Sequence, residues 1–143
     1  MTIQEIEAEI VEEFSIFEDW MEKYNYLIEL GRECPIIEEK DKNDNNLIKG
    51  CQSKVWVSAQ LKDGLMDIKA DSDAVITKGI ITLLLRVFNH QKPEDVENAD
   101  IGFLDKIGLT AHLSPTRSNG LNAMIKQIRL YAMAFSIKSQ QQK

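Results

Sequence analysis

Cysteine and histidine are scarce in this sequence, with two residues of each type. They are Cys34, Cys51, His90 and His112, and no pair of them has the close spacing that zinc and iron–sulfur sites use. We therefore expect no bound metal. The sequence also lacks a phosphate loop, a GxSxG or HExxH motif and a dinucleotide fingerprint, which removes the common signatures of nucleotide and hydrolase chemistry.

Long apolar runs and basic charge are scarce as well. No apolar stretch approaches the roughly 20 residues that a membrane-spanning helix needs. Lys and Arg number 17 against 23 Asp and Glu, which gives a net charge of −6. Because nucleic-acid surfaces are built mainly from Lys and Arg, we expect no nucleic acid as a partner. Since no long apolar run is present, we expect no membrane partner either.

The chain begins with an acidic segment, MTIQEIEAEIVEEF, which does not resemble a signal peptide. Together with the low cysteine content, this predicts free thiols and a cytoplasmic location. A chain of 143 residues is expected to form one domain, 1–143, with 137–143 as a frayed tail. The carboxylates between Glu5 and Glu18 are interpreted as the solvated face of helices.

Hydrophobic spacing predicts helices at both ends of the sequence. A capping box of Thr2 and Glu5 opens the first helix, and Ser15 with Glu18 is expected to open a second that stops near Gly31. A helix over 75–87 is apolar on most sides and therefore central, and Pro93 opens a short helix. The last long helix is capped by Ser114.

Between these helices the spacing of the apolar residues changes to every second residue, which is typical of β-strands. Residues 55–61 alternate in polarity, Asp63 and Gly64 form a hairpin turn, and 65–70 return. Leu47 and Ile48 are expected to start a further strand. The predicted class is therefore α+β, with a small antiparallel sheet and helices packed on one face.

Cys51 has the most suggestive surroundings, in KGCQSKVW (49–56). Gly50 permits unusual backbone angles beside it, and the cations of Lys49 and Lys54 favour a thiolate. A reactive thiol and a packing cysteine both remain open on this evidence. Cys34, in a polar connector before Pro35, is interpreted as incidental and exposed.

Other candidates have mainly structural interpretations. Asp71 and Asp73 are expected to cap the helix that follows, and Lys78 to extend its amine to solvent. His90 follows a helix end, where it would interact with the dipole. Arg117 is unusual, because a cation in the first turn of a helix opposes the dipole. Gly120 is expected where another backbone approaches closely, and His112 is a candidate for the pocket of Arg117.

Three blocks, GCQSKVW (50–56), ADSDAVITKGI (70–80) and LSPTRSNGL (113–121), resemble the signature blocks of the SufE-like family, in family order and spacing. The resemblance implies a sulfur acceptor that takes persulfide sulfur from a cysteine desulfurase and passes it to an iron–sulfur scaffold complex. It places the acceptor role on Cys51. It implies no bound cofactor, since pyridoxal phosphate belongs to the desulfurase, and a fold shared with IscU-like scaffold proteins.

Such chemistry calls for a loop that swings its cysteine between an apolar cavity and the partner. Gly50 would be the hinge, and Trp56 with the helix over 75–87 would wall the cavity. Five residues are expected to support the loop and the site around Cys51: Gly50, Gln52, Ser53, Trp56 and Arg117. Five others are candidates for contact with the partner protein: Lys49, Lys54, Asp71, Asp73 and His112. We expect a monomer or weak homodimer.

Two other classes of function remain open from the sequence. A cysteine hydrolase or thiol peroxidase would need a general base or a resolving cysteine near Cys51, for which only Cys34 and the two histidines could serve. A non-catalytic interaction domain would use Cys51 for packing alone.

Overall fold

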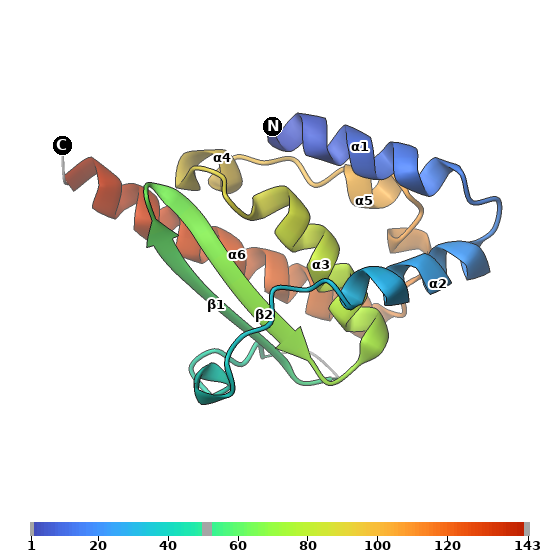
Figure 1. Ribbon diagram of the computed structural model, residues 1–143, viewed down its shortest axis with the longest axis horizontal. Helices are drawn as coiled ribbons and strands as arrows, with labels where there is room; N and C mark the ends of the chain where they lie inside the picture. Colours follow the sequence, from blue (N-terminus) through green and yellow to red (C-terminus); the bar gives the residue numbers. More distant parts are fainter. Residues whose placement is uncertain (1, 50–52, 142–143) are drawn as a thin grey trace.

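The computed structural model describes residues 2–49 and 53–141, with side chains through 138. Its elements are α1 (Ile3–Ser15), α2 (Trp20–Gly31), the short 3-10 turn η1 (Glu39–Asp41), β1 (Val55–Lys62), β2 (Leu65–Ser72), α3 (Val75–Phe88), α4 (Pro93–Glu97), α5 (Phe103–Lys106), η2 (Thr110–His112) and α6 (Pro115–Gln141). Figure 1 shows α6 passing behind the hairpin and α3, with α2 at the end of the molecule away from the hairpin turn. The predicted α+β class is confirmed.

The N-terminal helices begin at capping residues. The predicted box at α1 is confirmed, because the Glu5 N–H donates to Thr2 Oγ1 and the Thr2 N–H donates to Glu5 Oε1, both at 3.1 Å. The predicted Ser15 cap is wrong. Ser15 still belongs to α1 and donates its hydroxyl to the Glu12 carbonyl, so α2 starts later, with Asp19 Oδ1 accepting from the Glu22 N–H at 2.9 Å.

β1 and β2 form an antiparallel hairpin in the register Val55↔Ser72 to Lys62↔Leu65. The turn residues Asp63 and Gly64 have φ values of 55° and 81°, both in the region that a tight two-residue hairpin turn requires. One face of the hairpin is buried against helices and carries Val55, Val57, Met66, Ile68 and Ala70. Helices therefore cover a single face, as the alternation predicted.

The outer edge of β2 is covered by parts of the chain that are not strands. The Ile37 N–H donates to the Ala70 carbonyl at 3.2 Å, and the Ala70 N–H donates to the Pro35 carbonyl at 3.0 Å. The Asn89 side-chain amide accepts from the Ile68 N–H at 2.7 Å and donates to the Ile68 carbonyl at 3.0 Å. The strand predicted at Leu47 and Ile48 is only an isolated bridge, Leu47 to Trp56, on the β1 edge.

α3 is the central helix, as its apolar sequence predicted, and most of its residues are buried. Its closest neighbour is α2. A Cβ added at Gly79 would lie 2.1 Å from the Leu27 carbonyl oxygen, and one at Gly31 would lie 3.0 Å from the Gly79 nitrogen. Glycine is thus required where these two helix backbones meet.

α6 begins where the sequence predicted, since the Arg117 N–H donates to Ser114 Oγ at 3.2 Å. It continues to Gln141, so residues 137–141, which the sequence suggested as part of a frayed tail, are helical. The helix packs against β1 and α4. No helix in residues 2–49 or 53–141 has the length and apolar character that crossing a membrane requires.

Candidate functional site

A cavity of about 290 Å³ opens where β1, α3 and α6 meet. Its floor is apolar and buried, formed by Val55, Ile80, Leu121 and Met124. Polar groups surround its mouth. The residues lining the cavity are Ser53, Val55, Thr77, Ile80, Thr116, Arg117, Gly120, Leu121 and Met124. Of these, Arg117 is the charged residue, and it is exposed.

Three residues of the sequence-based site, Gly50, Cys51 and Gln52, lie outside the described residues. The structure describes the chain on both sides of them. Ser53 lines the cavity, and Lys49 is exposed on the other side. The cavity is therefore lined by the first described residue that follows Cys51 in the sequence.

Asp73 holds the C-terminal side of that segment. Its Oδ1 accepts from the Lys54 N–H at 3.0 Å, and its own N–H donates to the Lys54 carbonyl at 3.2 Å. The prediction that Asp73 caps α3 is therefore wrong. Ser72 accepts from the Ala74 N–H through its hydroxyl at 3.2 Å, just before the helix starts.

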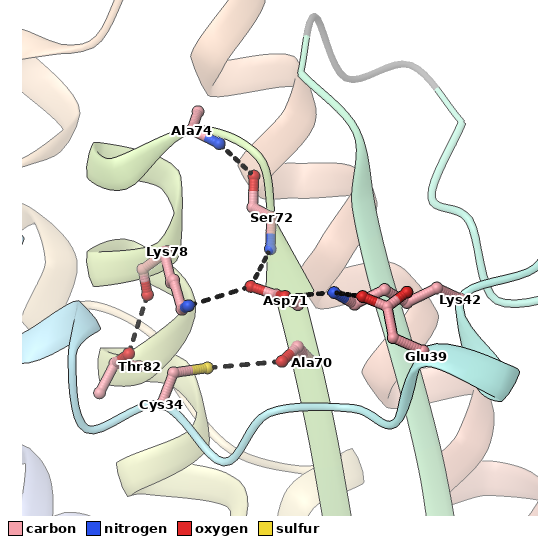
Figure 2. Close-up of polar contacts among 9 residues, drawn as sticks. All are labelled: Cys34, Glu39, Lys42, Ala70, Asp71, Ser72, Ala74, Lys78 and Thr82. Atoms are coloured by element: carbon pink, nitrogen blue, oxygen red, sulfur yellow. Dashed lines mark hydrogen bonds and ion pairs between the residues drawn. The ribbon is translucent and has the colours of Figure 1, made fainter.

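Asp71 lies at the centre of an ion-pair network (Figure 2). Its Oδ2 is 2.7 Å from Lys42 Nζ, and its Oδ1 is 3.2 Å from Lys78 Nζ and accepts from the Ser72 N–H. The network joins the 35–48 connector, β2 and α3. Both sequence interpretations are corrected here: Asp71 is not a helix cap, and the Lys78 amine is paired, because the connector folds over β2 and brings Lys42 close.

Burial by itself would raise the pKa of the Asp71 carboxyl, but hydrogen bonds from Lys42, the Ser72 backbone and Lys78 together hold that pKa below its ordinary value. The hydrogen bond that Lys42 donates to Asp71, with a further one that it donates to Glu39, raises the pKa of Lys42. Asp71 is only 8% exposed, so it presents little surface to a partner.

Trp56 and His112 lie elsewhere than expected. Trp56 sits on the outer face of β1, with Lys42 Nζ 5.5 Å from its ring centroid, and does not line the cavity. Since Val55 and Val57 point inward, their neighbour must point outward. His112 stacks on Trp20, with ring centroids 4.3 Å apart, and Nδ1 lies 2.8 Å from the Gly108 carbonyl oxygen. It does not line the cavity with Arg117.

Cys34 is buried, not exposed as its polar neighbours suggested. It is 6% accessible, and its Sγ lies 3.6 Å from the Ala70 carbonyl oxygen (Figure 2). Burial raises the pKa of the Cys34 thiol. His90 is exposed with φ of 61°, and its N–H bonds the Met66 carbonyl at 2.9 Å, beside the β2 edge.

The cavity combines an apolar floor with a guanidinium at its mouth. Such a site suits a group with an apolar stem and an anionic tip, because the stem is removed from water while Arg117 can pair with the charge. Within the described part of the chain, no three His, Cys, Asp or Glu side chains converge as metal ligands would.

Comparison with known proteins agrees with this architecture. A solution structure titled "hypothetical protein", from Thermus thermophilus, is similar to this chain, with a TM-score of 0.77 and 19% identity, over 92% of this chain and 96% of the other. At that identity the likeness shows the fold alone, and the IscU-like comparison gains no support from it. The family model described as SufE, Fe-S metabolism associated domain, matches residues 8–132. This chain therefore belongs to the SufE family, whose domain is associated with iron–sulfur metabolism.

Proposed function

We propose that this protein is a cytoplasmic sulfur acceptor and carrier, which takes persulfide sulfur from a separate cysteine desulfurase onto Cys51. It stimulates the desulfurase and delivers the sulfur to an iron–sulfur scaffold complex. The protein is an accessory factor, and pyridoxal phosphate is the cofactor of its partner. Membership in a family associated with iron–sulfur metabolism supports this role.

The transfer step resembles thiol–disulfide exchange. The Cys51 thiolate attacks the outer sulfur of the donor persulfide and forms a new S–S bond. The bond between that sulfur and the donor cysteine breaks, and the donor leaves as a thiolate. One sulfur atom passes from the donor cysteine to Cys51, and one S–S bond forms as one breaks, so the step needs neither oxidant nor reductant.

The observation that carries the proposal is the cavity beside Ser53. Ser53 follows Cys51 by two positions in the sequence, which is why we link this cavity to Cys51. A persulfide on Cys51 is an anionic, easily oxidised group on a short apolar stem. The buried Val55, Ile80, Leu121 and Met124 offer such a group a dry floor.

Arg117 is the described residue best suited to act on the sulfur. It lines the cavity mouth from the first turn of α6, and the structure shows no carboxylate paired with it among the described residues. A nearby guanidinium favours a thiolate over a thiol and equally favours a persulfide anion. We therefore assign Arg117 to stabilising the charged forms of Cys51.

The described residues give less support to hydrolase or peroxidase chemistry. Cys34 is buried against the Ala70 carbonyl, His112 is stacked on Trp20, and His90 lies at the β2 edge. None of them lines the cavity. A non-catalytic interaction domain would leave the cavity and Arg117 without a role.

The test is incubation with a cysteine desulfurase and cysteine, followed by mass spectrometry of peptides. We expect one added sulfur atom at Cys51, abolished by Cys51→Ser and retained in Cys34→Ser. The same protein alone should release no sulfide from cysteine, and added to the desulfurase it should raise turnover to a plateau. Sulfur found mainly on Cys34, or no sulfur on either cysteine, would overturn the proposal.

A further inference from the structure

The charge of α6 differs from that of the rest of the chain. The helix contains Arg117, Lys126, Arg129 and Lys138 and no Asp or Glu, although the chain as a whole has a net charge of −6. Arg129 is turned inward and donates to the Ala99 carbonyl at 2.6 Å. Lys126 and Lys138 are exposed, so the outer face of α6 presents basic side chains to solvent.

That outer face also carries large apolar side chains. Leu130, Met133 and Ile137 are 46%, 45% and 52% exposed. Their spacing of three and four residues places them in one line along the helix, while Ile128 and Ala132 are buried on the side facing the protein. A contiguous line of exposed apolar side chains with a polar rim is typical of a protein–protein contact.

The line continues toward the proposed acceptor site. Leu130 and Lys126 border a surface groove whose other wall includes Leu47 and Lys49 of the connector. Lys49 is exposed and lies two positions before Cys51 in the sequence. Asp44 is the acidic residue lining this groove, against the two lysines. A partner seated here would contact Lys49, the last described residue before Cys51 in the sequence.

We propose that this groove and the line Leu130–Met133–Ile137, together named the α6 docking face, bind the persulfide donor. The inference rests on the proposed sulfur-acceptor function. The fitting partner surface has apolar side chains flanked by carboxylates, placed near the donor sulfur. The charge argues against a second copy seated face to face, because two α6 helices would bring lysines against lysines.

The test compares variants in the half-saturating concentration at which this protein stimulates the desulfurase. Leu130→Gln with Met133→Gln removes the apolar contact and keeps good helix formers. We expect the half-saturating concentration to rise at least about fivefold, with maximal turnover unchanged, because docking weakens while the bound geometry stays the same. Lys126→Glu should act similarly at low salt and much less near 1 M salt, where charges are screened over roughly 3 Å.

Matched controls are Met21→Gln and Lys69→Glu, which change exposed side chains on α2 and β2. Their half-saturating concentrations should equal that of the unchanged protein. If the α6 variants have the same half-saturating concentration as the wild-type protein, and the wild-type protein stimulates the desulfurase to a plateau, the docking face is wrong and the sulfur-acceptor role stands. An equal effect of the control variants would likewise overturn the docking face.

Direct binding separates docking from sulfur transfer. Fluorescence anisotropy of labelled protein with the desulfurase should show the same weakening in the α6 variants. If the labelled protein binds through the α6 face but turnover stays flat, the docking face stands and the acceptor function is wrong. If sedimentation shows a homodimer that the α6 variants dissociate, the occupant is a second copy and the inference is overturned.

Discussion

Replacing Asp71 by asparagine tests the ion-pair network that joins the connector, β2 and α3. Asparagine keeps the size of the side chain and an oxygen for the Ser72 N–H, but removes the charge that Lys42 and Lys78 share. Removing one partner of a buried pair costs about 3–5 kcal/mol, and an exposed pair contributes about 1 kcal/mol or less.

The expected cost lies between these limits. The Asp71 side chain is 11% exposed, while the lysine side chains are 16% and 25% exposed and can regain some water. We therefore expect the Asp71→Asn variant to lose about 2 kcal/mol of unfolding free energy. For a chain of this size that lowers Tm by roughly 7 °C. Urea and thermal unfolding, followed by circular dichroism at pH 7, measure both quantities.

The effect should depend on pH in a defined direction. The pKa of Asp71 is lower in the folded protein than its ordinary value. Such a carboxyl stabilises the fold above its unfolded pKa, near 4, and this stabilisation disappears as pH falls through the lower folded value. The difference in unfolding free energy between the two proteins should therefore stay constant from about pH 7 to 5 and shrink below about pH 4.

Asp67→Asn is the matched control, since Asp67 lies on the same face of β2 and has no ion pair within residues 2–49 and 53–141. It should change stability by about 0.5 kcal/mol or less. A loss at Asp71 no larger than at Asp67, or one that persists unchanged at pH 3, would refute the argument that a charged network holds the connector.

Three further substitutions test other parts of the structure. Gly79→Ala should cost about 3 kcal/mol or more in urea unfolding, because its Cβ would fall 2.1 Å from the Leu27 carbonyl oxygen; a cost below about 1 kcal/mol would contradict that contact. Arg117→Ala should slow sulfur acceptance several-fold with stability changed by about 0.5 kcal/mol or less, and a large stability loss with normal transfer would make Arg117 structural. Cys34→Ser should cost about 1 kcal/mol and leave sulfur acceptance intact, and slower acceptance would give Cys34 a part in transfer.

Local signals in the sequence predicted much of the fold. The Thr2–Glu5 box, the Asp63–Gly64 turn and the Ser114 cap each involve residues close in sequence, and all three are present. The apolar character of α3 also predicted its central position. In each case the deciding interaction is short-range or follows from the period of apolar residues.

Several predictions that depended on distant parts of the chain were wrong. Asp71 looked like a cap because its partner Lys42 lies in a connector whose path over β2 cannot be inferred from its composition. The same path buries Cys34, whose polar neighbours had suggested exposure. Trp56 is different, since the inward alternation of Val55 and Val57 already contained the signal that it points outward.

The candidate site was predictable in its chemistry more than in its shape. Ser53 and Arg117 were chosen from sequence blocks, and the structure places both at one cavity. The helix over 75–87 was expected to wall a cavity, and Thr77 and Ile80 of α3 line this one. The α6 part of its floor, with Leu121 and Met124, was not predicted, because periodic apolar residues on two helices do not reveal where those helices meet. The role of Cys51 stays a prediction.

The covered edge of β2 has a consequence for how this protein behaves at high concentration. A two-stranded sheet exposes backbone donors and acceptors along both sides, and such edges recruit strands from other molecules into aggregates. Here the backbone of β2 is hydrogen-bonded at three residues: Ala70 to the connector, Ile68 to the side-chain amide of Asn89, and Met66 to the backbone of residues 90 and 91. The side-chain amide of Asn89 thus makes the two hydrogen bonds that a backbone peptide group of a neighbouring strand would make. The β2 edge is therefore closed to strands from other molecules, although no third strand of this chain pairs with it in the described residues.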